Sequence, residues 1–271
     1  MRILRISVSA LFIIVLIMFC IFKIQQLNAD NTYPVISIEE SILDVSIHAS
    51  ENDLMAGVTA YDEKDGDITD RIILESISSF TEPGICIVKY AVCDADNHAA
   101  SAERKIRYTD YTSPRFTLSE PLVFGISQNI NIRGILGAVD SIDGDISDKV
   151  IISANEYSSN IASVNYISAK VTNSKWEMIS IQLPVYIENR SLSAPEIRLT
   201  DYLLYLKTGD TLNIEETVIS ALDASGRNLK SQVTVDTNLN LNQPGLYEVH
   251  YRVSDSAGRE GHSILFVIVE D

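Results

Sequence analysis

The stretch Gly245-Leu-Tyr-Glu-Val-His-Tyr-Arg-Val-Ser-Asp255 indicates most clearly how this chain folds. Every second position holds an aromatic or β-branched residue: Tyr247, Val249, Tyr251 and Val253. The positions between them are polar: Glu248, His250, Arg252 and Ser254. Because successive side chains of a strand point to opposite faces of its sheet, this alternation predicts a half-buried β-strand. We therefore expect the polar set, His250 included, to face solvent.

The same stretch occurs in two earlier copies. In copy one it runs from Gly84 to Asp94, and the inward positions are Cys86, Val88, Tyr90 and Val92. In copy two the glycine and both tyrosines are missing, and the inward positions are Asn165, Ile167, Ala169 and Val171. Each copy opens on a proline about 80 residues after the last, at Pro34, Pro114 and Pro195. Such a period indicates a series of similar units.

Each copy reads as several short strands with turns between them, which is typical of a small β-sandwich. We therefore expect an all-β chain with three tandem sandwiches, over residues 33–109, 113–188 and 194–270. The connections are short, so the sandwiches are expected to be strung end to end. Each is expected to close its own core. No convincing helix is predicted outside the N-terminal segment.

The N-terminal segment predicts a membrane helix. Residues 1–5 are basic, and an uncharged run from Ile6 to Phe22 follows, closed by Lys23. As a helix this run spans roughly 25 Å, near the lower limit for a bilayer. Arg2 and Arg5 precede the run, which favours a cytoplasmic N-terminus with the rest outside the cell. A cleaved signal peptide is the alternative, and it would leave a secreted protein.

Composition excludes some partners. Acidic residues outnumber basic ones 37 to 21, giving a net charge of −16, which repels the phosphate backbone of nucleic acids. Three cysteines cannot form a disulfide scaffold. Cys86 and Cys93 lie seven residues apart on one predicted strand and therefore face opposite sides, so we expect Cys86 to be a small core residue.

An acidic turn is the sharpest candidate for chemistry. Copies one and two carry three aspartates each, with a glycine among them: Asp62, Asp65, Asp67, Asp140, Asp143 and Asp145. Several carboxylates around a glycine suit Ca²⁺, although the spacing is not that of an EF-hand. Asp-Gly is also a favoured turn pair. Copy three keeps only Asp223, which favours a structural role for the first aspartate of each copy.

No catalytic or cofactor-binding residues are predicted. His48, His98, His250 and His262 are scattered without metal-ligand spacing, and we expect them at the surface. The sequence has no nucleophile-elbow motif and no phosphate-binding glycine loop. Trp176, the single tryptophan, falls in a predicted turn. The sequence therefore predicts a protein that is not an enzyme and needs no cofactor, with calcium left open.

The repeat resembles the bacterial immunoglobulin-like domains of surface proteins, of the pesticidal-crystal-protein type and the related group 3. The strand-opening proline carries this resemblance, together with the segment 60–69 and the closing Gly–Tyr–Tyr–Val–Asp strand. Gly245-Leu-Tyr247 also resembles a tyrosine corner. The family implies three immunoglobulin-like sandwiches on the cell exterior, used as spacers or adhesive modules, with no catalytic residues.

The expected function is that of a membrane-anchored surface protein whose modules adhere to, or recognise, an extracellular protein or glycan. Copy one adds a possible contact surface, an outward and largely apolar stripe: Ile85, Ile87, Lys89 and Ala91. Two alternatives remain open, a structural spacer of the cell envelope and an extracellular rod stiffened by calcium. The sequence names no ligand.

Overall fold

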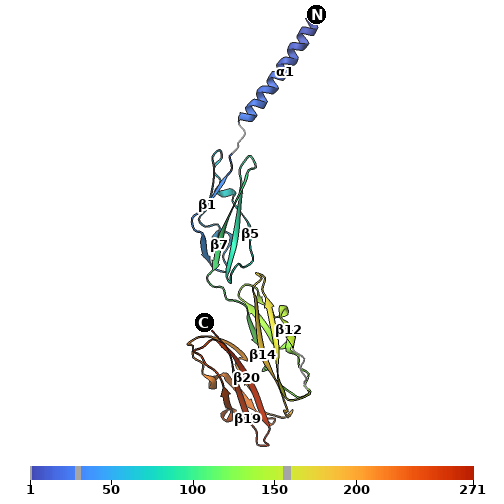
Figure 1. Cartoon of the computed structure of the whole chain (residues 1–271), viewed down its shortest axis with the longest axis vertical. Helices are drawn as coiled ribbons and strands as arrows, with labels where there is room; N and C mark the ends of the chain where they lie inside the picture. Colours follow the sequence, from blue (N-terminus) through green and yellow to red (C-terminus); the bar gives the residue numbers. More distant parts are fainter. Residues whose placement is uncertain (1, 28–31, 155–159) are drawn as a thin grey trace. The chain divides into compact units, whose positions relative to one another are not determined.

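The computed structural model describes residues 2–27, 32–154 and 160–271, and the side chains of its N-terminal helix from residue 11 to residue 24. The chain divides into two compact units, Met1–Asp110 and Tyr111–Asp271. Copy one lies in the first unit, and copies two and three together form the second (Figure 1). Beyond the N-terminal helix the chain is mostly β-sheet, in six sheets, which confirms the predicted fold class at this level.

The N-terminal segment forms helix α1 (Arg2–Leu27), which contains the uncharged run. Its large apolar side chains between Leu11 and Ile24 are exposed on all sides of the helix. Among the residues whose side chains the structure describes, which in α1 are residues 11–24, no helix is both long enough and apolar enough to span a membrane.

Copy one contains two sheets, with strand orders β1-β3-β4 and β2-β7-β6-β5. Its elements are β1 (Val35–Ile38), β2 (Ile42–Val45), α2 (Glu51–Leu54), β3 (Val58–Asp62), β4 (Gly66–Asp67), η1 (Thr69–Arg71), β5 (Ile73–Ile77), β6 (Ile85–Cys93) and β7 (Ala99–Tyr108). The four predicted inward positions of β6, from Cys86 to Val92, are buried in the core between the sheets.

Copy two has the same plan, with strand orders β11-β10-β8 and β12-β13-β14-β9. Its elements are β8 (Arg115–Leu118), β9 (Val123–Gly125), η2 (Ile132–Gly134), β10 (Leu136–Asp140), β11 (Gly144–Asp145), η3 (Ser147–Lys149), β12 (Ile151–Ala154), β13 (Ser163–Thr172) and β14 (Met178–Glu188). Ile167, Ala169 and Val171 of β13 are buried as predicted, and Asn165 is half-buried.

Copy three has strand orders β15-β17 and β16-β20-β19-β18. Its elements are β15 (Glu196–Leu199), β16 (Leu203–Lys207), η4 (Ile214–Thr217), β17 (Val218–Leu222), η5 (Lys230–Gln232), β18 (Thr234–Thr237), β19 (Gly245–Ser254) and β20 (Glu260–Glu270). In every copy the second strand pairs in parallel with the last one, so the chain crosses between sheets after its first strand.

In copies one and three a buried tyrosine, in β6 and in β19, contacts the connection between the second and third strands of its copy. The Tyr90 hydroxyl donates to the carbonyl oxygen of Leu54 in α2 at 2.6 Å. At the matching position of β19, the hydroxyls of Tyr251 and Thr217 lie 2.6 Å apart. Copy two has Ala169 there and lacks this link. The tyrosine corner predicted at Tyr247 is also present, since its hydroxyl donates to the Gln243 carbonyl at 2.9 Å.

Copies two and three share a core, so the expectation that each copy closes its own core is wrong for this pair. Leu265 and Val267 of β20 point into the core of copy three. Ile264 and Phe266, which alternate with them, pack into the core of copy two, together with Leu203 of β16. Strand β20 is therefore buried on both faces.

Copy one has a core of its own, and the residues on the outward face of its last strand explain why that face does not form a shared core as β20 does. At the positions of β7 that match Ile264, Phe266 and Ile268, copy one has exposed charged residues: Glu103, Lys105 and Arg107. Covering those charges with protein would remove them from water at a high free-energy cost. The apolar outward face of β20 instead gains free energy by burial against copy two.

Candidate functional site at the junction of copies two and three

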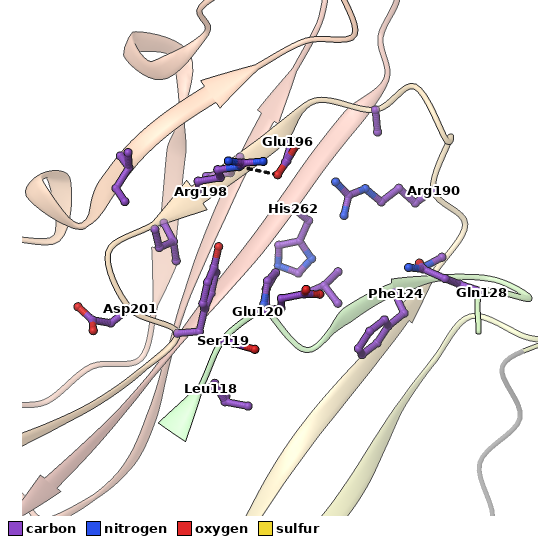
Figure 2. Close-up of a pocket in the computed structure, with 18 of the residues that line it drawn as sticks. Leu118, Ser119, Glu120, Phe124, Gln128, Arg190, Glu196, Arg198, Asp201 and His262 are labelled. Atoms are coloured by element: carbon purple, nitrogen blue, oxygen red, sulfur yellow. Dashed lines mark hydrogen bonds and ion pairs between the residues drawn. The ribbon is translucent and has the colours of Figure 1, made fainter. Parts of the chain in front are cut away.

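A groove of about 910 Å³ lies within the second unit, where copies two and three meet. The end of β8, strand β9, the linker 190–194, strand β15 and the loop to Tyr202 form its walls (Figure 2). Its lining includes side chains of both charge signs: Glu120, Arg190, Glu196, Arg198 and Asp201. Figure 2 places His262 of β20 among these side chains. The groove therefore offers hydrogen-bond donors and acceptors rather than one dominant charge.

The charged side chains of the groove use only some of their hydrogen-bonding atoms in contacts within the protein. Arg198 Nε donates to Glu196 Oε1 at 2.8 Å, and both of these side chains are well exposed. Arg190 Nη2 donates to the carbonyl oxygen of Pro195 at 3.1 Å, which fixes the linker. A ligand in the groove can therefore reach the remaining guanidinium and carboxylate positions.

A chain of hydrogen bonds crosses the junction behind the groove. His262 Nδ1 lies 2.8 Å from Glu188 Oε1, and its Nε2 lies 3.0 Å from Nδ1 of His250. His250 Nε2 lies 3.1 Å from Glu248 Oε2, which also accepts from the Tyr186 hydroxyl at 2.5 Å. Glu188 and Tyr186 come from β14 of copy two, and the other three side chains from copy three.

The burial of this chain changes the acidity of its members. Burial raises the pKa of the Glu188 carboxyl, but the hydrogen bond and charge of His262 outweigh it, so the net pKa is lowered. Burial and the neighbouring charge of His262 lower the pKa of His250. Burial and the contact with Glu248 raise the pKa of Tyr186 well above its ordinary value. Tyr186 therefore stays a neutral donor.

The structure corrects the expectation that these histidines lie at the surface. His262 is 2% exposed, and Glu248, His250 and Arg252 are half-buried rather than solvated. The predicted strand register is right, because His250 does point away from the core of copy three. The burial prediction is wrong because copy two covers that outward face.

A second set of contacts joins β8 of copy two to β16 and to the last residue of β20 in copy three. Arg115 Nη2 donates to Glu270 Oε2 at 2.6 Å, and its guanidinium carbon lies 4.8 Å from the centre of the Tyr205 ring. The Tyr205 hydroxyl accepts from the backbone N–H of Phe116 at 2.9 Å. The edge of β8 therefore has a hydrogen-bond partner in copy three.

The first aspartate of each acidic turn holds its own backbone. Asp62 Oδ1 accepts from the N–H groups of Lys64 and Asp65, both at 2.9 Å. Asp140 makes the same turn with the N–H groups of Ile142 and Asp143, and Asp223 holds its turn through the N–H groups of Ser225 and Arg227. The structure thus gives this position the structural role that its recurrence predicts.

The other acidic residues also have protein partners. Asp65 accepts from the Ala95 N–H at 2.7 Å, which links its turn to the hairpin between β6 and β7, and Asp143 accepts from the Ser174 N–H at 2.7 Å, which links its turn to the hairpin between β13 and β14. Asp67 and Asp145 accept from the N–H groups two residues ahead. Among the residues described, no group of three or more His, Cys, Asp or Glu side chains could hold a metal ion.

Calcium binding at Asp62, Asp65, Asp67, Asp140, Asp143 and Asp145 stays a prediction. A rise of the melting midpoint in millimolar calcium, absent in Asp143→Ala, would support it. An unchanged midpoint would dispose of it.

The outward stripe of copy one is less exposed to solvent than predicted. The outward stripe from Ile85 to Ala91 is half-buried, and Ile87 lines a shallow groove with Ile38 and Ile42. Cys86 is buried in the core, as predicted, and Cys93 is exposed.

Comparison with known proteins supports the predicted resemblance. Residues 203–269 match a family model described as a bacterial surface protein, Ig-like domain. The chain is 32% identical over 133 residues to pesticidal crystal protein Cry22Aa of Bacillus thuringiensis, a match covering 48% of this chain and 17% of that protein. It is 27% identical over 138 residues to an uncharacterised 81.3 kDa protein of Acholeplasma phage L2, covering 49% and 18%.

Among solved structures, the chain is similar to a Clostridium perfringens ZmpB structure that contains the M60 catalytic domain with the CBM51-1 and CBM51-2 domains. The sequence identity is 12% and the TM-score 0.25, over 90% of this chain and 31% of that one. The chain spans less than a fifth of the curated relatives it matches. The resemblance to bacterial immunoglobulin-like surface domains is confirmed on the family model and the crystal-protein relative.

Proposed function

We propose that this chain is a non-enzymatic surface protein that recognises an extracellular glycan through the groove between copies two and three. The groove is the observation that carries the proposal. Its volume of about 910 Å³ lies in the range of ligand sites. Its mixed donors and acceptors, with Phe124 and Tyr202 beside them, suit a ligand that has many hydroxyl groups and no net charge.

We propose further that α1 anchors the protein in a membrane, with the three copies outside the cell. The uncharged run Ile6–Phe22 supports this, and so does the exposure of apolar side chains all round the helix. A helix that is apolar on every side needs apolar surroundings. Membrane fractionation with intact-mass measurement tests the anchor. A mature chain that begins near Asp30 would support secretion instead.

The groove is tested with the full chain on a glycan array, followed by titration of any glycan that binds. Arg198→Ala removes a donor from the groove and only a surface ion pair from the fold, so the protein stays folded. We expect its affinity to fall by about tenfold or more. Arg227→Ala, at an exposed arginine of copy three outside the groove, is the matched control.

Two results would contradict the proposal. One is the absence of binding to any glycan on the array, which would favour the spacer interpretation. The other is a glycan that Arg198→Ala binds as tightly as the natural chain does. Deletion of copy three is not a clean test, because it would expose the part of the copy-two core that packs on Phe266.

A further inference from the structure

We propose that His250 and His262 together hold one proton more than two neutral imidazoles can carry, and that this shared proton closes the contact between copies two and three. The junction is then most stable in a window of pH and loosens on both sides of it. The proposal deepens the proposed function, since His262 also lines the groove. Its tests need no ligand.

The proton count follows from the contacts. Three of them involve ring nitrogens: Glu188 to His262, His262 to His250, and His250 to Glu248. Each contact lies between 2.8 and 3.1 Å and needs one proton between its two heavy atoms. Two neutral imidazoles and two carboxylates supply two protons in all. The third contact therefore requires an extra proton.

The surroundings favour this cationic pair. Glu188 and Glu248 lie at its two ends, and the Tyr186 hydroxyl donates to Glu248, which keeps that carboxylate an acceptor. The other charged groups nearby are Arg252 of β19, 3.9 Å from Glu188, Glu260 of β20, which accepts from Arg252 at 2.5 Å, and Arg190 of the linker. The planes of the two imidazole rings are inclined by 21° and their centroids lie 5.2 Å apart, so the rings meet edge to edge through the two nitrogens that are 3.0 Å apart.

The matching positions of copies one and two hold no histidine. Copy one has Lys89 and Ser101 at the matching positions of β6 and β7. Copy two has Ser168 and Ser180. Two of the four histidines of the chain are thus placed together on a sheet face of copy three that packs against copy two.

A fourth proton would set two N–H groups against each other across the 3.0 Å contact between the histidines. Loss of the third proton would place the lone pairs of His250 Nδ1 and His262 Nε2 opposite each other. The lowered pKa of His250 agrees with the acid side. Below about pH 6.5 histidine in the unfolded chain binds a proton that His250 in the folded chain does not bind. The free energy of unfolding therefore falls as the pH drops below that value. On the alkaline side stability falls as the shared proton leaves.

The direct test is NMR of the full chain labelled with ¹⁵N at histidine. Near neutral pH we expect a protonated Nδ1 in His262, a protonated Nε2 in His250, and a third proton between the rings. Two rings that titrate independently at the ordinary histidine pKa, with no third proton, would overturn the proposal.

The functional test measures hydrogen exchange along β20 and the melting midpoint of the second unit from about pH 5 to pH 9. We expect a maximum and a fall of about 3 °C or more towards either end. His250→Gln removes the titrating partner and should flatten this profile, whereas His48→Gln, in copy one, should leave it unchanged. Strand β7 is the internal reference for exchange.

The two proposals fail separately. If the natural chain and His250→Gln give the same pH profile, the shared proton does not stabilise the junction, whatever the groove binds. If the profile is as expected but no glycan binds, the junction is sensitive to pH and the proposed glycan recognition is wrong.

Discussion

Asp140 shows how much one buried carboxylate does in this fold. Its Oδ1 accepts from the N–H groups of Ile142 and Asp143, both at 2.9 Å, and its Oδ2 accepts from Asn173 Nδ2 at 3.2 Å. It therefore holds its own turn and connects that turn to the hairpin between β13 and β14. The same carboxylates can stabilise a turn or bind a cation, so the sequence alone does not distinguish these two roles.

We expect Asp140→Ala to destabilise the second unit by about 2–3 kcal/mol, because two backbone N–H groups and one amide lose their acceptor. Urea denaturation followed by circular dichroism measures the change. Asp148→Ala, at an exposed aspartate of the same copy, is the control and should have little effect. Equal stability of the two variants would show that Asp140 is not a structural residue.

Trp176 occupies an unfavourable backbone conformation. It lies in the hairpin between β13 and β14 with φ of 66°, and its side chain is 78% exposed. The matching positions hold Asn97, with φ of 69°, and Gly258, with φ of 73°. These two residue types accept the left-handed region more readily than tryptophan does.

We expect Trp176→Gly to raise the free energy of unfolding by about 1 kcal/mol, since it relieves the backbone without opening a cavity. Trp176→Ala keeps the penalty and should leave stability unchanged. Far-UV circular dichroism in urea measures both variants, because the substitutions remove the only tryptophan. A gain with alanine equal to that with glycine would mean that the tryptophan ring, and not the backbone, is responsible.

Strand β20 decides the architecture of the second unit. Its inward residues, such as Leu265, belong to copy three, and its outward residues Ile264 and Phe266 belong to the core of copy two. Phe266 is fully buried, whereas Lys105 at the matching position of β7 is exposed. The segment from Ile264 to Val269 is apolar without interruption, which is typical of a strand buried on both faces.

We expect Phe266→Lys to separate copies two and three while copy three keeps its fold. The charge cannot stay in the shared core, and an open junction would let it reach water as Lys105 does. Limited proteolysis in the linker 190–194 and hydrogen exchange in β9 should both increase. Val235→Lys, at a partly exposed position of β18, should leave both unchanged. A protected linker in Phe266→Lys would refute this account of the junction.

At the scale of the molecule, the chain has two compact units for its three repeats. Met1–Asp110 contains one core, whereas the cores of copies two and three are joined through Leu203, Ile264 and Phe266. Because these residues lose their apolar contacts when either copy unfolds, the two copies stabilise each other.

Calorimetry of the full chain should therefore show two transitions, one for each compact unit, with copies two and three unfolding together. Phe266→Lys should split the second transition into two. Three independent transitions in the natural chain would restore the picture of three separate domains.

The sequence by itself determined the repeat, the all-β fold class and the inward register of the closing strands. These features depend on local alternation: a residue at every second position of a strand must face the core, as Val88 and Val249 do. The structural role of Asp62, Asp140 and Asp223 in their turns was also predictable, because an aspartate recurs at this position in all three copies.

Only the tertiary structure decided what lies against the outward faces. The same alternation places His250 outward whether water or another sheet covers it, since a period of two describes one strand and not its surroundings. The junction depends on residues far apart in the chain, such as Glu188 with His262 and Arg115 with Glu270. The groove exists for the same reason: it forms where two folded copies meet, and no stretch of either copy contains it.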